Sequence, residues 1–243
     1  MKYKINDKVY KINLDELKNI GSGAEGNIYE FNGVALKIFN STRLRYGYTL
    51  SENKFKTMSK IPLDRFIMPS NLIYEKKNNS YKFVGHTMQL LKNNLPIYNF
   101  YSKDIKNIIN EIKLLESDID VLSDYKFKMY DFLHNFYYNG KLYMIDTSYY
   151  MEGLDIEKVY IHNKKSLNDF FIYNLLLKPT SNSLNLPNVP FDNNILLNFF
   201  DSNLDTTNLI FSDFLLNLYS NSTKTISDIQ KKHVKIYIKN FIK

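Results

Sequence analysis

The chain has 243 residues, of which 44% are hydrophobic, 15% aromatic and 23% charged, and its formal net charge is +7. This length can bury a core without covalent support, and the absence of cysteine excludes disulfide frameworks, thiolate zinc sites and cysteine nucleophiles. Only Arg43, Arg45 and Arg65 among the 32 basic residues are arginines, so the positive charge predicts a lysine-covered surface and no specific nucleic-acid partner.

The first residues, Met1 to Asp7, lack the apolar segment of a secretory signal. No apolar run further along approaches the roughly 18–20 residues that cross a bilayer. We therefore expect a cytoplasmic globular protein without a membrane span.

The front third of the chain predicts strands joined by turns. Residues 9–12 alternate at period two, and residues 28–31 and 34–39 flank Asn32-Gly33. Asn-Gly between two such runs is the strongest short hairpin signal, because both central residues must take positive φ. A short helix is expected over 50–58, followed by two strands over 71–75 and 81–91 that the polar turn 76–80 joins.

After residue 91 the pattern becomes helical. Residues 92–96 look like a connector, and Ser102 can cap a helix whose apolar positions are Ile105, Ile108, Ile109, Ile112 and Leu115. Beyond a loop and hairpin region over about 125–160, helices are predicted over 167–177, 193–200, 208–219 and 226–242. The lysines of the last helix fit a solvated face, or alternatively a binding patch. The change of pattern divides the chain into residues 1–91 and 92–243.

The densest motif is the string Gly21-Ser22-Gly23-Ala24-Glu25-Gly26-Asn27-Ile28, which holds three of the eight glycines. Such a string is either a plain glycine-rich turn or a phosphate-binding loop. A dinucleotide fold needs a helix after the glycines. Here a strand follows, so the string lies between two strands of a hairpin. This favours a glycine flap whose backbone N–H groups approach nucleotide phosphates.

A single lysine, Lys37, stands inside the apolar run 34–38. It is either an edge lysine that points to water or, on the strand paired with the flap, a phosphate-binding lysine. A lysine of the second kind needs an acid to position it. Glu52 on the next helix is the predicted ion-pair partner, and the alternative is that Glu52 is an ordinary exposed helix residue.

With these features the chain resembles a eukaryotic-type protein kinase, closest to the compact kinase-like proteins of bacteria and their viruses, from about residue 14 to about residue 178. The resemblance implies an α+β fold with two lobes, a small β-rich N-lobe with one helix and a mainly α-helical C-lobe. It also implies an ATP site in which Ile28 and Ala35 cap the adenine ring. The other implied nucleotide-binding residues are Gly21, Ser22, Gly23, Gly26, Lys37, Met88, Gln89 and Leu90.

In the second lobe the resemblance covers residues 128–146. It implies that Asp131 orients an acceptor hydroxyl and accepts its proton, with Lys37 and Glu52 completing the catalytic set. Asn135 and Asp146 are the implied ligands of Mg²⁺, or of Mn²⁺. His134 lies within this stretch, where it could support the loop. The other histidines, His86, His162 and His233, lie too far apart in the sequence to predict a metal site.

The chain departs from the family at four points. Asp131 precedes Asn135 by four residues and not five, so Tyr130 holds the expected position of the catalytic aspartate. Met129 replaces the expected histidine, Asp146-Thr147-Ser148 lacks the glycine of D-F-G, and no A-P-E segment is visible. Three functions follow: a protein serine/threonine kinase as the first choice, a small-molecule phosphotransferase of the aminoglycoside- or choline-kinase type, or a nucleotide-binding pseudokinase.

Overall fold

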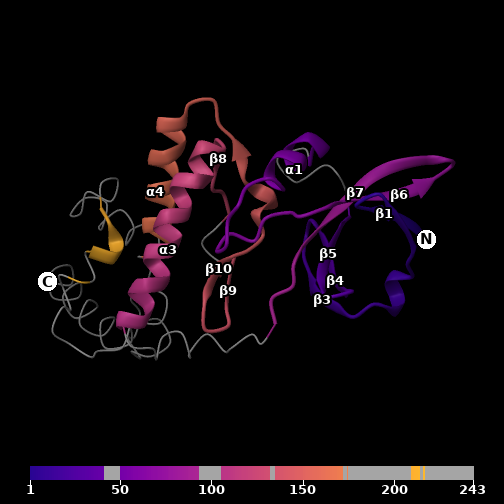
Figure 1. Ribbon diagram of the computed structural model, residues 1–243, viewed down its shortest axis with the longest axis horizontal. Helices are drawn as coiled ribbons and strands as arrows, with labels where there is room; N and C mark the ends of the chain where they lie inside the picture. The colour runs from indigo at the N-terminus through magenta and orange to yellow at the C-terminus, as the bar shows by residue number, and fades with distance from the viewer. Residues whose placement is uncertain are drawn as a thin grey trace, which may run out of the picture. The chain divides into compact units, whose positions relative to one another are not determined.

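The computed structural model describes residues 1–40, 50–92, 105–131, 135–171, 174, 209–213 and 216. It has a mixed α+β structure, and the chain divides into two compact units, Met1–Lys92 and Asn93–Lys243 (Figure 1). Across these described ranges, no helix combines the length and the apolar character that a membrane span requires.

The first unit is built on a seven-stranded antiparallel sheet in the order β2-β1-β6-β7-β5-β4-β3. The strands are β1 (Lys2–Ile5), β2 (Lys8–Lys11), β3 (Asn19–Ser22), β4 (Gly26–Phe31), β5 (Val34–Phe39), β6 (Leu72–Lys77) and β7 (Ser80–Gln89). A short 3₁₀ helix, η1 (Leu14–Glu16), connects β2 to β3. Strand β5 lies between β4 and β7, so Lys37 stands on an interior strand and the edge-lysine alternative is wrong.

Three hairpins of this sheet turn on residue pairs with positive φ. The predicted hairpin at Asn32-Gly33 is confirmed, with φ values of 47° and 81°. Asn78-Asn79 turns β6 into β7 in the same way, with φ values of 46° and 62°. Asn6-Asp7 does so between β1 and β2, and the sequence reading did not anticipate strand β1. Positive φ at both central residues fits the right-handed twist of the strands, and Asn and Asp tolerate it better than other side chains.

The sheet buries apolar side chains on both faces. One cluster comprises Tyr3, Ile5, Ile12, Leu36 and Ile73. The other comprises Phe39, Leu50, Phe55 and Phe83. Leu36 and Phe39 are an odd number of positions apart on β5, and strand side chains alternate, so they serve opposite faces. The predicted strand thus has no solvent-facing side.

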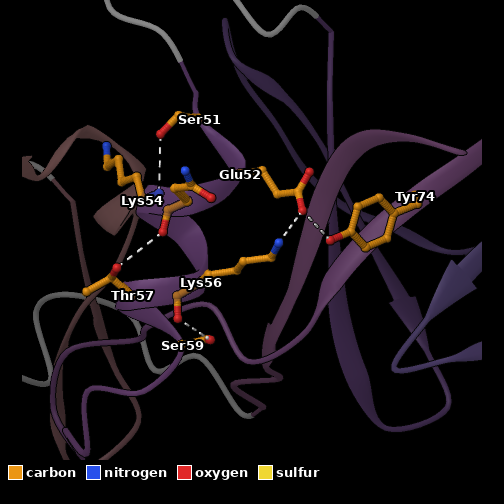
Figure 2. A network of polar contacts seen from close by, with 8 residues as sticks. Ser51, Glu52, Lys54, Lys56, Thr57, Ser59 and Tyr74 are labelled. Carbon is orange, nitrogen blue, oxygen red and sulfur yellow. Dashed lines mark hydrogen bonds and ion pairs between the residues drawn. The ribbon is translucent and has the colours of Figure 1, made fainter.

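Helix α1 (Glu52–Met58) covers the second of these clusters. Ser51 caps its N-terminus, because its hydroxyl accepts a hydrogen bond from the Lys54 N–H at 3.2 Å (Figure 2). Phe55 is fully buried and lies 5.5 Å from Phe39 and 5.1 Å from His86 between ring centroids. This packing fixes the helix against the face of the sheet that carries Phe39.

The second unit joins two helices, α3 (Ile105–Asp124) and α4 (Ile156–Phe171), which lie side by side (Figure 1). The segments that connect them are β8 (Phe127–Lys128), β9 (Phe136–Tyr138), β10 (Leu142–Met144), η3 (Thr147–Tyr149) and β11 (Met151–Glu152). The helical spacing predicted for α3 is confirmed at Ile108, Ile109, Ile112 and Leu115, which are all buried. The predicted cap Ser102 lies outside the described residues.

Helix α4 begins at Ile156, although the sequence predicts a loop and hairpin region to about residue 160 and a helix from 167. Asp155 starts it, with its carboxylate accepting from the Lys158 N–H at 3.2 Å. The buried stripe of the helix runs through Asn163 and Ser166 as well as Val159 and Leu167. Those two polar residues interrupt the apolar spacing, which is why the first half of the helix was missed.

The helices predicted over 193–200 and 226–242, the loop 178–192 and the connector beyond residue 92 lie outside the described residues. Within the helix predicted over 208–219, residues 211–213 and 216 are helical.

Candidate functional site

The glycine string forms the end of the β3–β4 hairpin. Gly23 N–H donates to the Gly26 carbonyl at 3.0 Å, which leaves Ala24-Glu25 as the turn. A side chain at Gly26 would place Cβ 2.2 Å from the Ile38 carbonyl oxygen, so the close approach of β4 to β5 requires glycine there. At Gly23 an added Cβ would meet no atom within 4 Å, so packing does not require that glycine.

The sheet register places several predicted site residues on one face. Gly21 pairs with Ile28, Ile28 pairs with Lys37, and Lys37 pairs with His86, which forms one row across four strands. Ala35 pairs with Met88 one step along the same face, because side chains of directly paired residues point to the same side.

The remaining predicted nucleotide-binding residues lie elsewhere. Ser22 pairs with Asn27 on the opposite face, and its hydroxyl is hydrogen-bonded to the side chain of Asn19. Gln89 pairs with Val34, also off this face, and is exposed, while Leu90 follows the last residue of β7.

Lys37 forms a buried ion pair with Glu25 from the turn of the glycine hairpin. Both residues are only 4% exposed. A buried ammonium group is stable when an anion and hydrogen bonds compensate its desolvation. Glu25 is therefore the ion-pair partner of Lys37, in the place that the sequence predicts for Glu52.

The predicted ion pair between Lys37 and Glu52 is wrong, because the Glu52 carboxylate binds two other groups. It accepts a hydrogen bond from the Tyr74 hydroxyl at 2.9 Å and pairs with Lys56 at 2.5 Å (Figure 2). Glu52 sits in the first turn of α1, where Lys56 is its i+4 neighbour and β6 presents Tyr74. Lys56 and Tyr74 hold the pKa of Glu52 below its usual value. Burial and the hydrogen bond to Glu52 raise the pKa of Tyr74 to about 12.

In the second unit, hydrogen bonds connect Asn135 to Asp131 and to Ile145, the residue before Asp146. The Asn135 amide group donates to the Asp131 carbonyl, and the Ile145 N–H donates to the Asn135 carbonyl at 2.9 Å. Between them β9 and β10 form a hairpin, inside the loop and hairpin region that the sequence predicts over about 125–160, and Gly140 at its turn has a φ of 100°. The three residues predicted from separate parts of the motif thus lie in one short stretch of structure.

Both aspartates of this group adopt left-handed backbone conformations, with φ of 52° at Asp131 and 57° at Asp146. Among non-glycine residues, aspartate and asparagine adopt this conformation most readily, so it is the backbone that these two positions favour. Asp131 is exposed and Asp146 is half-buried. Burial, together with the charge of Asp146, raises the pKa of Tyr150 beside it. The residues between Asp131 and Asn135, including His134, lie outside the described ranges.

Asn135 and Asp146 offer one amide oxygen and one carboxylate, which suit Mg²⁺. The NH₂ of Asn135 is committed to the Asp131 carbonyl, so its amide oxygen is the atom left to bind a cation. The described residues contain no group of three or more histidines or acids that could hold a metal by themselves. The donor set therefore fits an ion whose remaining ligands are water and phosphate.

The sequence reading missed the residues that brace the strand before Asp131. Asn163 of α4 is fully buried; its amide oxygen accepts from the Met129 N–H at 2.8 Å and its NH₂ donates to the Phe127 carbonyl at 2.7 Å. His162 donates through Nε2 to the Met129 carbonyl at 2.9 Å. The detectable signal was an asparagine at an apolar position of a helix, which predicts a hydrogen-bonded core residue.

Comparison of the chain with protein-family models and with curated proteins gives no match, so neither comparison assigns it to a family.

Proposed function

We propose that this chain is an ATP- and Mg²⁺-dependent phosphotransferase that transfers the γ-phosphoryl group to a hydroxyl acceptor. The observation that carries the proposal is the row Gly21–Ile28–Lys37 beside the glycine hairpin. Phosphate oxygens accept hydrogen bonds from loop N–H groups and from an ammonium group. Ala35 and Met88 are apolar residues on the same face of the sheet, as a site for a planar base requires.

In the proposed reaction Lys37 binds the α- and β-phosphates while the N–H groups of the glycine hairpin cover them. Mg²⁺ held by Asn135 and Asp146 would supply neutralisation of the phosphate charge. Asp131 orients the acceptor and takes the hydroxyl proton as the new O–P bond forms and the bond to the departing ADP oxygen breaks. These contributions are positioning and charge compensation, which dominate phosphoryl transfer.

The first acceptor class to test is a protein serine or threonine, as the family resemblance implies. Small hydroxyl compounds are the second, because the sequence shows no A-P-E segment that would help to dock a peptide.

A pseudokinase is the alternative that a specific observation favours. Tyr130 holds the position expected for the catalytic aspartate, and its ring lies 5.0 Å from the ring of His162. A tyrosine has no carboxylate and cannot replace that base. An active kinase would therefore need Asp131, one residue later in the sequence, to reach the acceptor.

The test is a transfer assay with γ-labelled ATP and Mg²⁺ or Mn²⁺, together with nucleotide affinity, on the parent chain, Asp146→Ala and Asp120→Ala. Asp120 is an exposed residue of α3 in the same unit and supplies the matched control. We expect Asp146→Ala to reduce transfer at least about 100-fold, a size typical of a lost charge-stabilising group, with Asp120→Ala unchanged.

Transfer that survives in Asp146→Ala would refute the assignment of the metal ligand. Metal-dependent nucleotide binding without transfer to proteins or small hydroxyl compounds would establish the pseudokinase instead. If the parent chain binds no nucleotide, the proposed function is wrong.

A further inference from the structure

The turn of the glycine hairpin carries an acid that is held in place from several directions. The Glu25 carbonyl accepts from the Asn40 N–H at 2.8 Å, and the carboxylate is paired with Lys37. Gly26 brings the turn against the backbone of Ile38, because any Cβ there would lie 2.2 Å from the Ile38 carbonyl oxygen. The backbone of the turn thus directs Glu25 onto β5.

The position of Glu25 has an electrostatic consequence for Lys37. An isolated buried ammonium group attracts anions, whereas the Lys37–Glu25 pair is neutral. A phosphate oxygen that approaches Lys37 also approaches the Glu25 carboxylate, and like charges within about 4–6 Å oppose each other. An anionic ligand therefore competes with Glu25 for the same ammonium group.

The end of the hairpin has room to change its contacts. Ser22, Gly23 and Ala24 are exposed, and an added Cβ at Gly23 would meet nothing within 4 Å. Because the Glu25 backbone is held by Asn40, release of the ion pair requires rotation of the Glu25 side chain, which carries its carboxylate away from Lys37 and toward solvent, where its charge is hydrated.

We propose that Glu25 latches a polyphosphate-binding site at Lys37: its carboxylate is paired with the Lys37 ammonium group, and a phosphate oxygen of a di- or triphosphate replaces that carboxylate. The choice of phosphate as the anion rests on the proposed function, while the exchange itself follows from the buried pair. Nucleotide binding then opens the ion pair and frees the hairpin end to close over the phosphates.

The test compares Glu25→Gln with Glu75→Gln and the parent chain by calorimetric titration with inorganic pyrophosphate, ATP and AMP. Glu75 of β6 is ion-paired with Lys77 at 3.9 Å, so its substitution changes the net charge equally at another part of the sheet. We expect Glu25→Gln to bind pyrophosphate and ATP at least about tenfold more tightly than the parent chain, with a smaller gain for AMP, because a negative charge that repels the phosphate is removed from beside Lys37. Glu75→Gln should bind like the parent chain.

The outcomes separate this proposal from the proposed function. If the parent chain binds and transfers from ATP but Glu25→Gln gains no affinity, the latch is wrong and the function stands. If Glu25→Gln gains affinity for pyrophosphate but no variant binds ATP, the latch stands and the function is wrong. Weaker binding by Glu25→Gln would show that Glu25 positions Lys37 for the ligand and would overturn the latch.

Glu25→Gln leaves Lys37 without this partner and can fail to fold. In that case the parent chain itself is titrated with pyrophosphate while the backbone amide resonances are followed by NMR. The latch requires shifts at Glu25, Gly26 and Asn40, since release of the carboxylate changes the turn. Saturation without shifts at these three residues would overturn it.

Discussion

Replacement of Asn163 by alanine should destabilise the second unit more than any ordinary polar substitution. Asn163 is fully buried on α4 and joins it to two other segments through three hydrogen bonds. These run to the Met129 N–H at 2.8 Å, the Phe127 carbonyl at 2.7 Å and the Ser123 hydroxyl at 3.1 Å. An alanine methyl group can make none of them.

The expected magnitude follows from the groups left behind. Phe127 and Met129 are themselves fully buried, so their freed carbonyl and N–H have no access to bulk water. A buried polar group without a partner costs about 1–3 kcal/mol, and the Ser123 hydroxyl can rotate to another acceptor. We therefore expect a loss of about 3–5 kcal/mol in the free energy of unfolding, against a usual total of about 5–15 kcal/mol.

Urea unfolding followed by far-UV circular dichroism measures this loss, and hydrogen exchange at the Met129 amide localises it. Asn110→Ala is the control, because Asn110 is exposed on α3 and should change stability by less than about 0.5 kcal/mol. A loss below about 1 kcal/mol for Asn163→Ala, or unchanged protection of the Met129 amide, would refute the view that Asn163 holds this strand.

Two further changes test the first unit. Gly26→Ala should destabilise it by about 1–3 kcal/mol in thermal or urea unfolding, because the new Cβ would lie 2.2 Å from the Ile38 carbonyl oxygen. Gly23→Ala is the control: its Cβ would meet no atom within 4 Å, so its stability should be within about 0.5 kcal/mol of the parent chain. Equal effects of the two substitutions would contradict the packing argument. The pKa of Tyr74 is raised from 10.0 to about 12, so folding stability should fall as pH rises from 10 to 12, since the unfolded chain loses this proton first. Tyr74→Phe should show a smaller fall across that range in pH-dependent unfolding, and an identical fall in both proteins would rule out this contribution.

Local sequence signals were sufficient where neighbours along the chain determine the structure. Period-two alternation and Asn32-Gly33 predicted β4 and β5, and helical spacing predicted the buried side of α3. Strand β1 also alternates, but its four residues include two lysines and were not recognised as a strand. Short strands of this kind are stabilised by pairing, here with β2 and β6, which a single segment does not reveal.

The contacts of the candidate site were less predictable, because they depend on how turns and helices are oriented. Glu25 is one of the residues between the glycines of the string, and nothing in the string indicates that its side chain turns back onto β5. Glu52 was the reasonable partner for Lys37 by order along the chain. Glu52 instead pairs with Lys56 and Tyr74, and Tyr74 lies 22 residues away from Glu52 on a strand whose position only the sheet topology determines.

The segment after Asp146 bears on where regulation of the proposed reaction can lie. Thr147 and Ser148 are each 2% exposed and form a 3₁₀ turn closed by the Tyr150 N–H to the Thr147 carbonyl at 3.0 Å. With no glycine in this turn, the unusual conformation falls on Asp146 itself, where an aspartate tolerates it. A buried turn without glycine is poorly suited to switch between two conformations, because both would need low-energy φ values. The glycine hairpin is the better candidate for a movable element, because the residues at its end are exposed and its Glu25 carboxylate is ion-paired with Lys37.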